Sequence, residues 1–157
     1  MSHSSAPSMA VGIFCLHQVW RQHDEPIYVA GMYRAWQYAC SVPPDYVCAT
    51  DLRVMAAMIK RRPVVEHFRL YDNISVGGNV PPPAERVPEL IDYMLDAQNR
   101  MTSDELAKEY LRIHPEEDGN GRVASLLINI KDRTLDKPRD LPDFDWGPQM
   151  VPMKVEG

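Results

Sequence analysis

Residues 114–122, His-Pro-Glu-Glu-Asp-Gly-Asn-Gly-Arg, constrain this chain more than any other stretch, because a glycine-rich turn here runs directly into an apolar segment. That segment has the spacing of a helix, with Val123, Ala124, Leu126, Leu127, Ile128 and Ile130. The first backbone N–H groups of a helix have no partner inside it, and the helix dipole adds partial positive charge there. We therefore predict that the turn binds an anion such as a phosphate group.

The individual residues of the turn suit this role. Gly119 and Gly121 permit positive φ angles and let a ligand approach the backbone closely. Asn120 can adopt the left-handed conformation at small cost and can donate from its side-chain amide. Arg122 lies in the first helical turn, where a cation opposes the dipole, so it is better placed to neutralise a phosphate than to stabilise the helix.

His114 and Asp118 add two reactive groups. A histidine can take a proton from an attacking hydroxyl group. A carboxylate beside a phosphate suits Mg²⁺, which commonly binds one or two protein carboxylates together with phosphate oxygens. A base, a metal ion, an anion site and a fixed cation together indicate phosphoryl or nucleotidyl transfer. The alternative is an ordinary surface loop, because Asp, Gly and Asn are common turn residues.

The same stretch resembles the signature of Fic domains, His-x-Phe-x-(Asp/Glu)-Gly-Asn-Gly-Arg-x-x-Arg. Two positions differ, because Glu116 stands in place of the phenylalanine and Ser125 in place of the second arginine. The positions that match are His114, Asp118, Gly119, Asn120, Gly121 and Arg122.

A region upstream extends the resemblance. Residues 76–83 and the segment after them are similar to the flap hairpin of Fic domains and the helix that follows it, so that the resemblance covers about residues 50–131. It implies that the flap aligns a target segment by main-chain pairing. The flap residues are Gly77, Gly78, Asn79 and Val80. The alternatives are an ordinary hairpin and, for the three prolines at 81–83, a polyproline ligand.

The resemblance implies an adenylyltransferase that moves AMP from ATP to a Ser, Thr or Tyr hydroxyl of a target protein. His114 would be the base, and Asp118 would hold Mg²⁺ on the α and β phosphates. The backbone of residues 119–121 and the Asn120 side chain would form the anion site, with Arg122 on the β phosphate side. A separate antitoxin chain is a further partner that one chain leaves open.

The two differences from the signature leave other functions open. In Fic domains the second arginine binds the terminal phosphate of ATP, so we expect Ser125→Arg to raise ATP affinity about tenfold. Glu116 cannot be buried in place of the phenylalanine without a partner. The alternatives are a catalytically impaired Fic-like binding or scaffold protein, and transfer of another phosphate-containing group from a donor that lacks a γ phosphate. A phosphotransferase of the Doc type is disfavoured, since that family has lysine where this chain has Gly121.

Many Fic proteins have an inhibitory helix with the pattern Ser/Thr-x-x-x-Glu-(Gly/Asn). The only Glu-Gly pair in this chain is Glu156-Gly157, and four residues before that glutamate lies Pro152. Proline is a poor residue for a helix interior. We therefore predict that the isolated protein is not autoinhibited.

Composition and charge limit the class further. The formal net charge is −5, which argues against non-specific binding to nucleic acid. No apolar run reaches the length of about 18 residues that a membrane span needs, and no secretory signal is recognisable, so we expect a cytoplasmic protein. Cys15, Cys40 and Cys48 lack the spacing of a metal site or a disulfide framework and fit buried thiols in a reducing compartment.

The 157 residues are expected to form a single, mostly α domain over 11–147, between a disordered tail at 1–10 and a C-terminal tail at 148–157. We expect five to seven helices, a helix–loop–helix site and a small β-hairpin flap. Spacing predicts a helix over 26–40, whereas 11–20 is undecided between strand and helix.

Capping signals place the other helices. Thr50 is expected to be the N-cap of a helix that ends at Lys60-Arg61-Arg62, interpreted as a solvated basic end. Pro88 fits the first turn of a helix. Thr102 and Glu105 form a capping box, which predicts a helix from about 103 that stops before Pro115.

Overall fold

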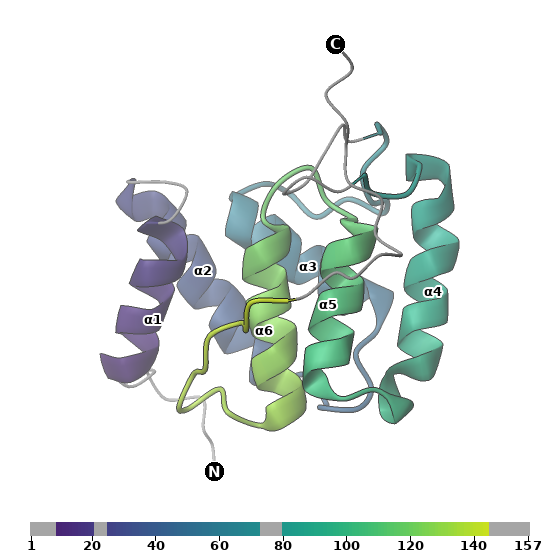
Figure 1. Ribbon diagram of the computed structural model, residues 1–157. Coiled ribbons are helices and arrows are strands. Elements are labelled where there is room, and N and C mark those ends of the chain that lie inside the picture. The colour runs from purple at the N-terminus through teal and green to yellow at the C-terminus, as the bar shows by residue number, and fades with distance from the viewer. Residues whose placement is uncertain (1–8, 21–24, 73–79, 145–157) are drawn as a thin grey trace.

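The computed structural model describes residues 9–20, 25–72 and 80–144, and this part of the chain is mostly helical, as the sequence predicted (Figure 1). Two 3₁₀ helices, Ala84–Arg86 and Gln98–Arg100, flank one of the α-helices. The six α-helices of the described residues are α1 (Met9–Trp20), α2 (Pro26–Ala39), α3 (Ala49–Lys60), α4 (Val87–Ala97), α5 (Ser103–Ile113) and α6 (Asn120–Asp132).

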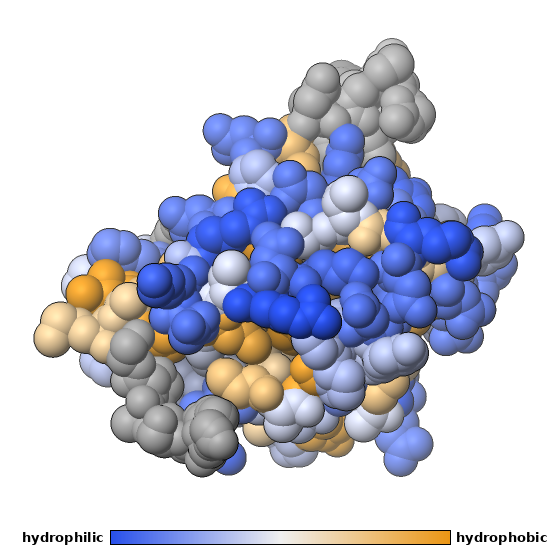
Figure 2. Space-filling model, turned by 90° about the horizontal axis from the view of Figure 1, so that it is seen from below, coloured by the Kyte–Doolittle hydropathy of each residue, from blue (hydrophilic) through white to orange (hydrophobic). Residues whose placement is uncertain are grey.

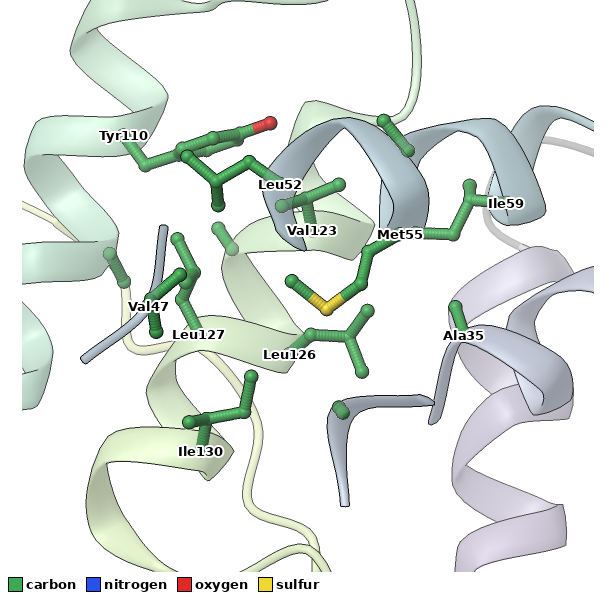
Figure 3. Close-up of a cluster of buried hydrophobic side chains, with 14 of the residues drawn as sticks. Ala35, Val47, Leu52, Met55, Ile59, Tyr110, Val123, Leu126, Leu127 and Ile130 are labelled. Carbon is green, nitrogen blue, oxygen red and sulfur yellow. The ribbon is translucent and has the colours of Figure 1, made fainter. Parts of the chain in front are cut away.

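Helix α6 lies at the centre of the bundle, between α5, α3 and α2, while α1 packs on α2 and α4 packs on α5 (Figure 1). Every residue from Arg122 to Ile130 is buried, which is the pattern of a helix surrounded by others. In Figure 3, Leu126 of α6 and Met55 of α3 point toward one another, with Leu127 beside them. The central position of α6 fixes its first residue, Asn120, against the bundle.

The N-terminal region forms two helices. The apolar segment that was undecided between strand and helix is α1, and its Met9 and Ala10 fall within the tail that was expected to be disordered. The helix predicted over 26–40 is α2, and its Trp36 is a core residue, as the spacing indicated. The Trp36 indole N–H also donates to the Leu135 carbonyl at 2.8 Å, which holds the segment after α6 against the bundle.

The start of α3 corrects one prediction. The N-cap is Cys48, and Thr50 lies inside the helix. The Asp51 carboxylate accepts from the backbone N–H of Cys48 at 3.0 Å. The third residue of the helix therefore satisfies the N–H of the N-cap residue, as in a capping box. An acidic residue in the first turn also interacts favourably with the helix dipole.

The signals at α4 and α5 are confirmed. Pro88 occupies the first turn of α4. At α5 the Thr102 side chain accepts from the N–H of Glu105 at 3.1 Å, and the Glu105 carboxylate accepts from the N–H of Thr102 at 2.8 Å. This reciprocal pair is the predicted capping box.

The β-hairpin flap is not seen: the described residues contain no strand. Of the predicted flap, Gly77, Gly78 and Asn79 lie outside the described residues, as does the whole of the expected C-terminal tail at 148–157. Val80 is described, is exposed and has no regular structure.

Among the described residues, no helix is long and apolar enough to cross a membrane. Seen from the end of the bundle opposite the α5–α6 turn, the molecular surface is mainly hydrophilic, with smaller apolar areas between (Figure 2).

The expectation of buried thiols holds only in part. Cys15 is buried and burial raises its pKa to about 12, whereas Cys40 and Cys48 are exposed.

Candidate functional site in the α5–α6 turn

The turn begins where α5 ends, at His114. This residue has φ 55° and ψ 61°, a left-handed conformation that is uncommon for a residue with a side chain. The proline that follows disfavours the right-handed helical region at His114, and the His114 N–H still donates to the Tyr110 carbonyl at 2.9 Å. The left-handed step turns the chain out of the helix axis, so that residues 115–119 form a loop over the end of the bundle.

The imidazole of His114 is partly buried. Its Nδ1 atom is buried without a hydrogen-bond partner of good geometry among the described residues. Burial, followed by the positive charge of Arg69, lowers the pKa of His114 to about 4, while the nearby Leu111 carbonyl and the Asp118 carboxylate oppose the shift. The ring is therefore neutral at physiological pH and has a nitrogen available to accept a proton.

The Asn120 side chain holds the loop together. Its Oδ1 accepts from the N–H of Glu116 at 3.0 Å, and its Nδ2 donates to the carbonyl of the same residue at 2.8 Å. Asn120 is also the first residue of α6 and is not left-handed. We expected its amide to line the anion site. In the structure both amide heteroatoms bind the loop backbone, because a buried asparagine must satisfy its polar atoms.

The two glycines of the turn have different roles. Gly119 has φ 87°, and a Cβ there would meet the Ile59 side chain at 3.3 Å, so this position needs glycine. Gly121 has an ordinary helical conformation, so it does not use the positive φ that glycine permits. A Cβ at Gly121 would meet nothing within 4 Å, so the space in front of it is open to a ligand.

Asp118 and Arg122 lie close together at the start of α6. Arg122 Nη2 is 3.5 Å from Asp118 Oδ2, and the two side chains are 3% and 50% exposed. Burial lowers the pKa of the Arg122 guanidinium, and the Asp118 charge opposes this. The described residues hold no group of three or more His, Cys, Asp or Glu suited to a metal ion. Asp118 therefore fits Mg²⁺ only as a single carboxylate whose metal takes its other ligands from phosphates and water.

Glu116 is buried at 6% exposure, in the place where the Fic signature has phenylalanine, and it has the partner that burial requires. Its Oε1 accepts from Lys60 Nζ at 2.7 Å, and both side chains are largely buried. Burial raises the pKa of Glu116, and Lys60 opposes the shift. Lys60 is therefore not part of a solvated helix end, although Arg61 and Arg62 are exposed as expected.

Arg69 is a component of the site that sequence reasoning missed. It is 3% exposed, and its guanidinium contacts the backbone where α5 ends. Nε donates to the His114 carbonyl at 2.6 Å and Nη2 donates to the Ile113 carbonyl at 3.2 Å. Its backbone N–H also donates to the Pro115 carbonyl at 2.8 Å. Nothing in the sequence near Arg69 signals these contacts, because they cross more than 40 residues of chain.

Ser125 faces α1. It is fully buried, and its hydroxyl donates to Gln18 of α1 at 3.0 Å. An arginine at this position would have to enter the contact between α6 and α1, where a charge without a partner is costly. The expectation that Ser125→Arg raises ATP affinity is therefore not supported by the position of the residue.

Two surface pockets lie near the turn, and one of them borders the loop. One, of about 300 Å³, includes Lys60, Glu116 and Glu117, and the other, of about 330 Å³, extends along α3 toward the start of α4. Arg53, His67, Phe68 and Arg69 line both, and the Arg53 guanidinium lies 5.5 Å from the centre of the Phe68 ring. The pockets place a partly apolar surface beside the loop.

No protein-family model matches the sequence, and no curated protein matches it. Solved structures do. A Fic family protein from Desulfovibrio desulfuricans matches with a TM-score of 0.60 and 23% identity over 79% of this chain and 46% of that one. IbpAFic2 covalently tethered to Cdc42 matches with a TM-score of 0.68 and 14% identity over 98% of this chain and 56% of that one.

A histidine-to-alanine variant of IbpAFic2, in complex with adenylylated Cdc42, matches with a TM-score of 0.60 and 13% identity over 98% of this chain and 57% of that one. At these identities the likeness shows the fold. The chain has the fold of Fic domains, as the motif resemblance implied. It spans about half the length of the solved structures that it matches.

Proposed function

We propose that this protein is a Fic-type nucleotidyltransferase that moves AMP from ATP to a hydroxyl side chain of a target protein. The observation that carries the proposal is the α5–α6 turn, where His114, Asp118 and the open start of α6 at Gly121 lie within nine residues on a Fic fold. The structure of IbpAFic2 with adenylylated Cdc42 supports the class of reaction.

His114 would act as the base. The target hydroxyl oxygen attacks the α phosphorus, the bond from that phosphorus to the β phosphate oxygen breaks, and pyrophosphate leaves. His114 takes the hydroxyl proton at Nε2, since Nδ1 is buried. A pKa of about 4 makes His114 a weak base in the free protein. The negative charge of bound phosphates would raise that pKa toward neutrality and strengthen the base where it is needed.

The rest of the turn would bind the phosphates. The backbone N–H groups of Asn120 and Gly121 at the start of α6 would face the anion, and Arg122 would supply a fixed positive charge. The Gly119 N–H donates to the Asp118 carboxylate at 2.9 Å and would help to orient that side chain. Asp118 would hold Mg²⁺, which when bound neutralises charge on the α and β phosphates. Arg122 Nη2 lies 3.5 Å from Asp118 Oδ2, so the cation and the carboxylate are adjacent at the start of α6.

The test is incubation of the protein with labelled ATP, GTP, UTP and CDP-choline in a cell lysate. His114→Ala should lower transfer of label to protein by at least about a hundredfold, the usual effect of removing a positioned base. His17→Ala is the matched control, because His17 is an exposed histidine on α1. Transfer that survives in His114→Ala at the level of the control would exclude His114 as the base.

A second variant tests the phosphate site separately. Gly121→Ala adds a Cβ in open space to a helical residue, so folding stability should be unchanged or slightly improved. The added methyl group would occupy the space in front of the first helical turn, so nucleotide affinity should fall about tenfold or more. Unchanged affinity would mean that the phosphates bind elsewhere.

One observation favours a second candidate. Ser125 is buried against α1 and leaves no cation at the position where Fic domains bind the terminal phosphate. Transfer from a donor without a γ phosphate would not need that cation. Label from CDP-choline but not from ATP in the lysate experiment would select this candidate, and label from none would select a binding or scaffold protein.

The proposed function implies two protein partners. The target would be a protein with a Ser, Thr or Tyr hydroxyl, and a separate antitoxin chain would be a second partner. We place the protein in the cytoplasm, without nucleic acid or a membrane as partner.

A further inference from the structure

Arg69 joins three separate stretches of backbone. Besides the carbonyls of Ile113 and His114, its Nη1 donates to the Tyr71 carbonyl at 3.1 Å and its Nη2 donates to the Pro82 carbonyl at 2.5 Å. Tyr71 and Pro82 belong to segments 69–72 and 80–84, on either side of residues 73–79. One guanidinium therefore connects the end of α5 to both of these segments.

The acceptors explain why the residue is arginine. Four hydrogen bonds from the Arg69 side chain go to backbone carbonyls, which converge on it from different directions. A planar guanidinium has five N–H donors in a fixed fork, whereas a lysine ammonium has three donors on one atom. Carbonyls at the C-terminus of a helix also carry partial negative charge, which a buried cation offsets.

A second contact closes the same junction. The backbone N–H of Ala84 donates to the Asp72 carboxylate at 2.7 Å, so the two segments are also joined directly. Asp72 is exposed, and its charge raises the pKa of Arg69 against the lowering effect of burial. The junction therefore has a buried centre at Arg69 and an exposed link at Asp72.

We propose that Arg69 is a positioning residue that fixes segments 69–72 and 80–84 relative to His114, and thereby sets where a target protein is held relative to the base. The proposal rests on the proposed function for its effect on transfer. Its structural part, the rigid junction, can be tested without any activity.

The structural test is amide hydrogen exchange. Arg69→Lys keeps the charge but cannot reach all the carbonyls, so exchange at the Ala84 amide should become about tenfold faster or more, the effect of losing one charge-assisted hydrogen bond. Arg53→Lys is the matched control, because Arg53 lines the same pockets but stacks on Phe68. Exchange at Ala84 that is equal in Arg69→Lys and the control would overturn the proposal.

The functional test separates target binding from nucleotide binding. Arg69→Lys should raise KM for the target protein about tenfold while ATP affinity changes by less than about twofold, because the start of α6 is held by other contacts. Asp72→Ala, at an exposed position, should raise the target KM in the same direction without risk to the core. An equal loss of target and ATP affinity in both variants would assign Arg69 a general folding role and overturn the proposal.

Failure of the two proposals is distinguishable. If the wild-type protein transfers no label, the proposed function is wrong, and the exchange experiment alone decides whether Arg69 holds the junction. If transfer occurs and depends on His114 but the target KM of Arg69→Lys matches the control, only the positioning role is wrong.

Discussion

The two ends of the α5–α6 pair are stabilised by different kinds of contact. At one end α5 begins and α6 finishes, and at the other end the chain turns from α5 into α6 (Figure 1). Because both ends belong to the same two helices, they can be compared within one molecule.

At the end where α5 begins, each charged contact includes a carboxylate that is partly or largely exposed. The capping box at Thr102 is exposed, and Arg139 links Asp132 and Asp104 across the helices. Lys131 pairs with Asp45 at 2.8 Å, and the carboxylate is 40% exposed. Water can solvate these charges if a partner is removed, so each contact contributes modestly.

The end at the turn uses buried groups. Glu116 and Lys60 form an ion pair with both side chains largely buried, and Arg69 and Arg122 are each 3% exposed. His114 has a left-handed backbone. Buried charges and strained backbone cost free energy and persist only when surrounding contacts hold them in place. The charged groups of the turn are therefore held in place before any ligand binds. Such preorganisation is what stabilises charge that develops during a reaction.

The largest expected loss of stability comes from breaking the buried ion pair of Lys60 and Glu116. Lys60→Met leaves Glu116 buried without its partner, and removal of one partner of a buried pair usually costs about 3–5 kcal/mol. Lys131→Met is the matched control at the other end, because it leaves an exposed carboxylate, and its loss should be clearly smaller. Urea denaturation of both variants measures the difference.

A double variant sharpens this test. Lys60→Met with Glu116→Leu removes both charges, and most of the lost stability should return, since an apolar pair can replace a buried ion pair. Equal losses in Lys60→Met and Lys131→Met would show that the two ends do not differ in the way their charges are solvated.

The pH dependence of stability gives the next effect. The pKa of His114 is about 4 in the folded protein and 6.5 in an unfolded chain, so between these values the unfolded chain binds the proton and the folded one does not. Stability should therefore fall as pH drops from 6.5 toward 4, by about 1–2 kcal/mol once the partial exposure of the ring is allowed for.

The variant His114→Asn isolates this contribution. The difference in unfolding free energy between the wild type and His114→Asn should change across that pH window, with His17→Asn as the control for removing an exposed histidine. Glu116 has a raised pKa and acts in the opposite direction, but it is present in all the proteins compared. A constant difference across the window would show that His114 has an ordinary pKa.

The comparison also explains which features the sequence could reveal. The capping box at Thr102, Pro88 and the glycine-rich start of α6 are local signals, because the groups that interact lie within four residues. At the end where α5 begins, the capping box is of this kind and was predictable, whereas Arg139 reaches Asp104 across 35 residues and Lys131 reaches Asp45 across 86. A local signal can still be misplaced by a residue or two. At α3 the N-cap is Cys48, whose N–H donates to Asp51, and not Thr50 as predicted.

The turn itself depends on contacts that no local pattern contains. Lys60 reaches Glu116 across 56 residues, and Arg69 reaches His114 across 45. The sequence showed that a buried Glu116 would need a partner, but not which one. The Asn120 amide could equally have faced a ligand or the loop, and only the folded loop places Glu116 where the amide binds it.

A smaller effect tests the end where α5 begins. Thr102→Ala removes the capping oxygen and should destabilise the protein by about 1 kcal/mol. Thr50→Ala is its matched control, since Thr50 lies inside α3 and does not cap it, and should change stability by less than about 0.5 kcal/mol. Thermal or urea unfolding of the two variants compares them. A larger loss in Thr50→Ala would restore Thr50 as the cap.

The smallest effect concerns Tyr110, which lies under the turn. The residue is fully buried, and its hydroxyl has no hydrogen-bond partner among the described residues. Burial, with the nearby Glu116 charge, raises its pKa well above the usual value, so the phenol stays neutral. Tyr110→Phe removes a polar group that gains nothing from folding, so stability should be unchanged or improve by up to about 1 kcal/mol.

This outcome would complete the contrast with Thr102, where removal of a hydroxyl costs stability because the hydroxyl accepts a hydrogen bond. A loss of more than about 1 kcal/mol in Tyr110→Phe would mean that a bound water satisfies the phenol. The buried polar network under the turn would then extend from Glu116 to Tyr110, and the difference between the two ends would be larger than the direct contacts alone indicate.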